Sequence, residues 1–223
     1  MSISKNLSNI KFQLPDNVTL VAVSKTKPVS DLMEAYNAGQ RIFGENKIQE
    51  LVEKQPLMPD DVEWHMIGHV QRNKVKYMAS FVELIHGVDN FKLLKEINKQ
   101  ALKHNRVINC LLQIKIASED SKFGMTVDEA TSILTSEEFN SLNNIKVVGL
   151  MGMATFTDNQ DQLKKEFTHL KQTFGKLQEI KGENCELETI SMGMSGDFQL
   201  AIECGSTMVR VGSSIFGARN YSI

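Results

Sequence analysis

The 223-residue sequence is poor in the residues that mark secreted domains, with three cysteines, four prolines and one tryptophan. Cys110, Cys185 and Cys204 are too few for a disulfide framework and are more typical of a reducing compartment. No apolar run approaches the ~18 residues that a membrane span needs. Residues 1–17 also lack the apolar stretch of a signal peptide. The sequence therefore predicts a cytoplasmic protein without a membrane span.

The sequence has no strong charge of either sign, since 25 basic and 27 acidic residues leave a formal net charge of −2. Such a balance argues against a nucleic-acid binder held by phosphate contacts. Three common motifs are also missing: the GxSxG elbow, the Walker loop and the dinucleotide glycine fingerprint. There is no charge run, low-complexity segment or long flexible linker, so residues 1–223 are predicted to form a single domain.

What the sequence does contain is a regular alternation of short apolar runs and helical stretches. One helix is predicted after residue 28, with Ser30 as its cap and Gly39 closing it. Another is marked by an apolar stripe at spacings of three and four, made of Leu163, Phe167, Leu170, Phe174 and Leu177. The eight predicted strands are 18–23, 41–44, 62–67, 81–86, 107–116, 145–150, 187–190 and 207–211.

Eight strand–helix units in one domain predict a (β/α)8 TIM barrel, preceded by a short helix around residues 3–12. An open, doubly wound sheet is the alternative. Both architectures place ligand chemistry at the carboxyl ends of the strands. The residues that follow each strand are therefore the candidates for function.

Lys25 follows the first strand on the same face as Val21 and Val23. A lysine whose stem lies against apolar walls can act as a nucleophilic amine or form a Schiff base. The alternative is an ordinary solvated lysine.

On the last strand, Arg210 alternates with Val209 and Val211, so it points into the barrel if the valines face the helices. Its partner there is then an acidic side chain of the barrel or a ligand at the mouth.

Two glycine- and serine-rich turns follow the last two strands, at 191–197 and 212–214. Glycine lets the backbone approach a ligand, and free N–H groups at a helix start bind anions. Barrels commonly hold a phosphate in these two loops. The pair therefore predicts a phosphate site.

His65 and His69 have the spacing of a helical metal pair, but they lie on a predicted strand and turn, so we do not predict a metal site.

Seven short motifs follow one another over nearly the whole chain. They are VAVSKTKP (21–28), FGENKIQE (43–50), HMIGHVQRNK (65–74), SKFGM (121–125), GLMGM (149–153), SMGMSGD (191–197) and VRVGSSIFG (209–217). Each alone is weak, but together they are highly specific. In these motifs the chain resembles the pyridoxal phosphate homeostasis proteins.

The resemblance implies the barrel of the fold-type-III enzymes that use pyridoxal 5′-phosphate (PLP), similar to the N-terminal domain of alanine racemase. It implies that Lys25 holds PLP as a Schiff base and that Arg210 contacts the pyridine nitrogen, which weakens the electron sink of the cofactor. Four residues would hold the phosphate: Ser195, Gly196, Gly212 and Ser213. Three would line the ring: Asn46, His86 and Met151. The chain departs from the family pattern at Lys115, where we expect asparagine, and at Gly87, where serine is more usual.

The function implied is that of a PLP carrier and regulator in intracellular vitamin B6 homeostasis, without robust catalysis. Its partners would be PLP, together with amino acids or PLP-requiring apoenzymes, and it would be a monomer or weak dimer.

Two alternative functions remain. A fold-type-III amino-acid racemase needs a second acid–base group, and none of Tyr36, Tyr77 and Tyr221 carries a motif for that role. The short segment after Val211 is also expected to leave no room for such an enzyme's second domain. A sugar-phosphate barrel enzyme would use the phosphate site without PLP.

Overall fold

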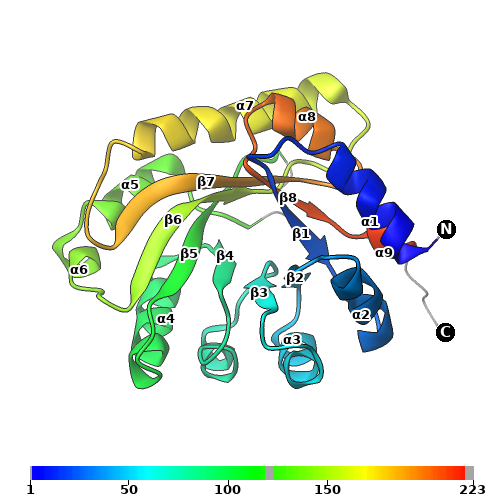
Figure 1. Cartoon of the computed structure of the whole chain (residues 1–223). Coiled ribbons are helices and arrows are strands. Elements are labelled where there is room, and N and C mark those ends of the chain that lie inside the picture. Colours follow the sequence, from blue (N-terminus) through cyan, green and yellow to red (C-terminus); the bar gives the residue numbers. More distant parts are fainter. Residues whose placement is uncertain (1, 119–122, 219–223) are drawn as a thin grey trace.

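The structure is a computed structural model that describes residues 2–118 and 123–218. Its eight strands are parallel and close into one barrel in sequence order, with the last strand returning to pair with the first. Helices surround the strands on the outside (Figure 1). The predicted (β/α)8 barrel is therefore confirmed. The open, doubly wound sheet is wrong, because the first and last strands of the chain are hydrogen-bonded neighbours.

All eight predicted strands are present, with ends that differ from the prediction by a few residues. Their bounds are β1 (Thr19–Val23), β2 (Ile42–Glu45), β3 (Glu63–Met66), β4 (Leu84–Val88), β5 (Ile108–Ile114), β6 (Ile145–Gly152), β7 (Cys185–Met194) and β8 (Met208–Val211).

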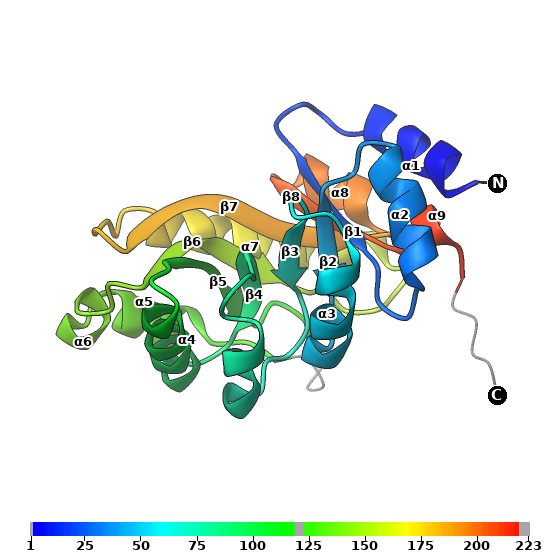
Figure 2. The ribbon, with the colours of Figure 1, turned by 60° about the horizontal axis from the view of Figure 1, so that its bottom comes forward.

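The helices fill the connections, except between β3 and β4, where a 3-10 helix takes their place. The first helix lies against α9 near the end of the described chain (Figures 1 and 2). The bounds are α1 (Ile3–Phe12), α2 (Val29–Asn37), α3 (Ile48–Lys54), η1 (Gln55–Leu57), η2 (Arg72–Tyr77), α4 (Phe91–Lys103), α5 (Val127–Leu134), α6 (Glu137–Asn140), α7 (Gln160–Leu177), α8 (Phe198–Glu203) and α9 (Ser213–Phe216). None of the helices in the described ranges is both long and apolar enough to cross a membrane.

Two local predictions are corrected. Strand β7 runs four residues further than predicted, to Met194, because Met194 still pairs with Arg210 of β8. The pairing shifts register between Ser191 and Met194, where Gly193 takes a positive φ of 96°. The first half of the predicted glycine-serine turn is therefore strand. Helix α2 begins at Val29 with Pro28 as its cap, so Ser30 lies inside the helix. Gly39 does close it, with a φ of 87°.

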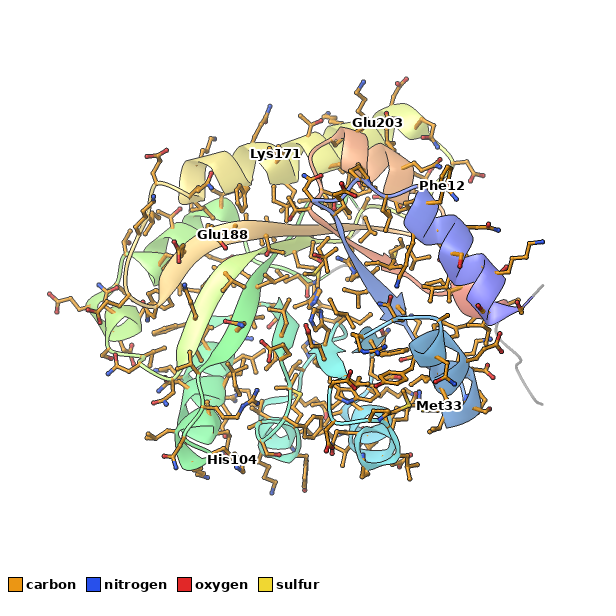
Figure 3. All side chains as sticks on the ribbon, viewed as in Figure 1. Phe12, Met33, His104, Lys171, Glu188 and Glu203 are labelled. Carbon is orange, nitrogen blue, oxygen red and sulfur yellow. The ribbon has the colours of Figure 1, made fainter. Side chains whose placement is uncertain are left out.

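The apolar side chains form two layers, one on each side of the strands. The larger layer lies between strands and helices and contains Val209, Val211 and the predicted stripe of α7. Charged side chains such as Lys171 and Glu203 point away from it to the outside (Figure 3). The smaller layer fills the barrel interior and is made of Val21, Val23, Ile67, Leu84, Leu111, Met151 and Met208. The carboxyl end of the barrel above this inner layer is where the candidate site lies.

Candidate functional site

A cavity of about 750 Å³ opens at the carboxyl ends of the strands. Small-molecule sites commonly have volumes of roughly 300–1,000 Å³. Seven of the nine predicted site residues line it: Lys25, Asn46, Ser195, Gly196, Arg210, Gly212 and Ser213. The other two predicted site residues are His86 and Met151. Both are buried in the barrel interior and are not among the residues that line the cavity.

Lys25 lies in a tight turn directly after β1. The turn is closed by a hydrogen bond from the Lys27 N–H to the Ser24 carbonyl, with a distance of 3.1 Å. Val21 and Val23 belong to the inner layer, and Lys25 lines the cavity above them. Its side chain is half-buried, as expected for a lysine whose stem follows the apolar wall.

Arg210 is only 4% exposed and lies at the floor of the cavity. Its guanidinium donates from Nη1 to Oγ of Ser191 at 2.6 Å and from Nη2 to the Gly152 carbonyl at 3.1 Å. Burial lowers the pKa of Arg210 to about 10, and the charge of Asp197 acts in the opposite direction. The group therefore stays charged at neutral pH and is oriented by a hydroxyl and a carbonyl.

A chain of buried hydrogen bonds continues from Arg210 into the barrel. Oγ of Ser191 is 3.0 Å from Nδ1 of His86, and Nε2 of His86 is 3.0 Å from Nδ1 of His65. Because Arg210 already donates to Ser191, the Ser191 proton is available to Nδ1 of His86. This assigns the His86 proton to Nε2, which donates it to His65. His86 thus acts on the cavity through Ser191 and Arg210.

The loops after β7 and β8 are joined at the predicted phosphate site. The Gly212 N–H donates to Oγ of Ser195 at 3.1 Å. A Cβ built on Gly196 would meet no heavy atom within 4 Å, so open space lies beside this backbone. Asp197 accepts the N–H of Met194, and its burial raises the pKa of its carboxyl, while the charge of Arg210 lowers it. The loops therefore present donors, a hydroxyl and one carboxylate to the same cavity.

His65 and His69 do not converge on a common point. His65 is inside the barrel, whereas His69 stacks on Phe123 with ring centroids 4.9 Å apart and has Nδ1 3.3 Å from Oδ2 of Asp89. Within residues 2–118 and 123–218, no group of three or more His, Cys, Asp or Glu side chains is arranged to hold a metal ion.

Several cavity-lining residues carried no predicted role. Lys27 lines the cavity and donates from Nζ to the carbonyls of Phe216 and Ala218, at 2.8 and 3.0 Å, which ties the loop after β1 to the chain after β8. Both Lys27 and Asp197 lie inside the motifs used for the resemblance, so their charge next to a proposed anion site was a usable signal. Others come from the ends of β5 and β7 and from the loops after β5 and β6, and include Gln113, Phe123, Thr155, Phe156 and Met194.

The two departures from the family pattern lie outside the cavity lining. Lys115 is exposed to solvent. A Cβ on Gly87 would come within 2.6 Å of the Gly68 carbonyl oxygen, so glycine suits the close approach of these two segments. Ser121 and Lys122 of the SKFGM motif lie outside the described residues.

Comparison with known proteins agrees with this fold. The family model for the alanine racemase N-terminal domain matches residues 1–220. The pyridoxal phosphate homeostasis protein of Pasteurella multocida is 38% identical, and the alignment covers all of both chains. PipY of Synechococcus elongatus, solved with PLP bound, is 32% identical, with a TM-score of 0.88 over 97% of this chain and all of PipY. Alanine racemase of Clostridium difficile matches 99% of this chain and 57% of its own at 16% identity and a TM-score of 0.77, a likeness of fold alone.

Proposed function

The chain belongs to the family of pyridoxal phosphate homeostasis proteins, within the wider alanine racemase N-terminal domain family, and from this we propose that it binds PLP through Lys25 and takes part in vitamin B6 homeostasis. The observation that carries the proposal is the pairing of β1 with β8. It brings a half-buried lysine and a buried, fixed arginine to one cavity. The protein of similar fold and sequence that was solved with PLP supports PLP as the ligand.

The donor set of the cavity fits a phosphorylated pyridine aldehyde. When bound, PLP supplies an aldehyde that a lysine amine holds reversibly as a Schiff base. Lys25 is the amine at the wall, and Arg210 is the fixed donor at the floor for the ring nitrogen. The open space beside Gly196 suits a phosphate that approaches the backbone. The phosphate partners in this proposal are Ser195, Gly196, Gly212 and Ser213.

The three remaining predicted site residues have different roles in this proposal. Asn46 lines the cavity and is proposed to contact the ring. His86 and Met151 lie beneath the floor, so we assign them to its support: His86 orients Arg210 through Ser191, and Met151 packs in the inner layer. An arginine that is already charged keeps the pyridine nitrogen unprotonated. Such a site stores the aldehyde better than it drives carbanion chemistry.

Family membership also supports a proposal for the compartment, oligomeric state and partners of the protein. We place the protein in the cytoplasm as one PLP-binding domain over residues 1–223, a monomer or weak dimer. Its further partners would be amino acids or PLP-requiring apoenzymes that take up the stored aldehyde. The three cysteines without disulfide partners and the single closed barrel support this view.

The test is a spectrum of the purified protein mixed with PLP, followed by borohydride reduction and mass spectrometry of the adduct. We expect visible Schiff-base absorbance and a reduced adduct on Lys25. Lys25→Ala should abolish both, and Lys27→Ala, which removes a second lysine from the same cavity, should keep the Lys25 adduct. An adduct of equal yield in Lys25→Ala would refute the assignment.

The same samples separate the alternatives. Absence of any Schiff-base absorbance would favour a sugar-phosphate barrel enzyme. Fast, Lys25-dependent exchange of the alanine α-hydrogen for solvent deuterium would favour a racemase, because that exchange requires proton transfer at the α-carbon.

A further inference from the structure

A buried cluster of charged groups lies directly behind the turn that carries Lys25. Glu45, at the end of β2, is fully buried, and Lys54, in the last turn of α3, is 8% exposed. Nζ of Lys54 donates to Oε1 of Glu45 at 2.8 Å and to Oε2 of Glu50 at 3.1 Å. Oε1 of Glu45 also accepts the Ser24 hydroxyl at 2.6 Å. The cluster therefore joins β1, β2 and α3 just below the mouth of the barrel.

The cluster binds both peptide units that flank Lys25. Nζ of Lys54 donates to the carbonyl of Ser24 at 3.0 Å, and the N–H of Thr26 donates to Oε2 of Glu50 at 2.7 Å. The Ser24 carbonyl belongs to the peptide before Lys25, and the Thr26 N–H belongs to the peptide after it. Because each peptide unit is planar, holding both planes fixes the two backbone dihedrals of Lys25. The direction of its Cα–Cβ bond is then set by Lys54 and Glu50.

The turn needs this support, because Thr26 has a φ of 64°. A β-branched residue rarely adopts that left-handed conformation, which glycine normally supplies. Strained backbone of this kind persists where the surroundings over-determine it, and it gathers at functional sites. Here the hydrogen bonds from Lys27 to Ser24 and from Thr26 to Glu50 supply that constraint.

Stability alone is a poor explanation for the cluster. A buried ion pair often contributes no more than apolar side chains of the same volume. In addition, Oε2 of Glu45 is buried with no hydrogen-bond partner among the described residues, which adds a desolvation cost. The hydrogen bonds of this charged cluster go to Ser24 and Thr26, the two residues that flank Lys25. This placement indicates that the cluster serves to position Lys25.

We propose that Lys54 and Glu50, anchored by Glu45, are positioning residues that hold the backbone of Lys25 so that its amine faces the cavity. The inference rests on the proposed function, because it concerns how fast and how completely Lys25 captures an aldehyde. Neither Lys54 nor Glu50 is among the cavity-lining residues, so neither contacts the ligand itself.

The experiment compares variants on two ligands. PLP reports covalent capture by Lys25, through the rate of Schiff-base formation. Pyridoxine 5′-phosphate has an alcohol in place of the aldehyde and reports binding of ring and phosphate alone. The test variants are Lys54→Met and Glu50→Ala. Glu50→Gln is the conservative variant, because its amide oxygen can still accept the Thr26 N–H.

Asn184→Ala is the matched control for loss of a buried polar group. Its amide donates to the carbonyls of Phe139 and Leu142, away from the cavity. We expect Lys54→Met and Glu50→Ala to slow capture of PLP by about tenfold, the order of effect that small misplacement of a reacting group produces. Glu50→Gln and Asn184→Ala should stay within about twofold of the parent rate. All four should bind pyridoxine 5′-phosphate with unchanged affinity.

The outcomes separate the two proposals. Test variants that capture PLP as fast as Asn184→Ala would overturn the positioning role, and so would equal losses for both ligands, which would indicate general damage to the site. Glu50→Ala removes a partly exposed side chain and keeps the test valid if Lys54→Met does not fold. If Lys25→Ala retains the adduct, it is the proposed function that fails.

Discussion

Nε2 of His86 lies 3.0 Å from Nδ1 of His65 in the barrel interior, and both rings are buried. Burial lowers the pKa of His65 to about 3. Burial also places the pKa of His86 well below its ordinary value, and the charges of His65 and Arg210 add to this effect. Two imidazoles of the folded protein are therefore neutral at a pH where the unfolded chain protonates them.

This pair makes stability depend on pH in a defined window. Above about pH 7 neither state binds the protons, and the pair adds no pH dependence. As the pH falls below ~6.5, both histidines become protonated in the unfolded chain but stay neutral in the folded protein. Each histidine therefore lowers the free energy of unfolding by about 1.4 kcal/mol per pH unit. Urea unfolding at about pH 7 and about pH 5 measures the loss, above the range where ordinary carboxylates titrate.

His65→Asn is the control for this prediction. The asparagine oxygen can accept from His86 as Nδ1 of His65 does, but it does not titrate. The variant should lose stability less steeply between the two pH values than the parent. Equal slopes in parent and variant would show that His65 is not the group responsible.

Asp197 places a carboxylate in the same cavity as the proposed phosphate partners Ser195 and Gly196. Asp197→Asn keeps an oxygen that can accept the Met194 N–H and removes the negative charge facing Arg210. Repulsion of a phosphate dianion should fall, so we expect PLP and inorganic phosphate to bind about threefold to tenfold more tightly. Titrations at low and high salt check this, because screening should shrink the gain. Unchanged or weaker phosphate binding at low salt would contradict it.

Replacement by alanine should have opposite effects on stability and on PLP binding at two glycines, Gly149 and Gly196. A Cβ on Gly149 would overlap the carbonyl oxygen of Thr189 in the neighbouring strand β7, whereas a Cβ on Gly196 would meet open space. Gly149→Ala should lower the free energy of unfolding by about 3 kcal/mol, since the strands must move apart. Gly196→Ala should leave stability nearly unchanged and weaken PLP binding.

Thermal or urea unfolding, paired with PLP titration, distinguishes the two glycine variants. A stable Gly149→Ala protein would mean that β6 and β7 can separate at low cost. Unaltered PLP affinity in Gly196→Ala would remove Gly196 from the phosphate site.

The barrel was predictable because its signals are local. Alternating apolar runs mark strands, and the stripe from Leu163 to Leu177 is the buried face of α7. The end of β7 was missed because SMGM resembles a turn, yet tertiary pairing with β8 carries the strand through it. Residue type favours Ser30 as the cap of α2, whereas in the structure the helix begins after Pro28.

The site was predictable where one residue at a strand end sufficed, as for Lys25 and Arg210. It was not predictable where contacts join distant segments. The lysine and two glutamates behind Lys25 come from FGENKIQELVEK, and nothing local in that segment shows that they face residues 24–26. Similarly, the sequence places His86 at a strand end, but only the barrel shows that Ser191 stands between it and Arg210.

The pairing of Val21 with Arg210 has a consequence for how the protein is made. The lysine follows the first strand and the arginine lies on the last, so the cavity does not exist until residues 19–23 meet residues 208–211. A chain in which these two strands have not yet paired therefore lacks the complete cavity. A ligand that contacts both strand ends binds the closed barrel and not the unfolded chain, so its binding stabilises the pairing of β1 with β8.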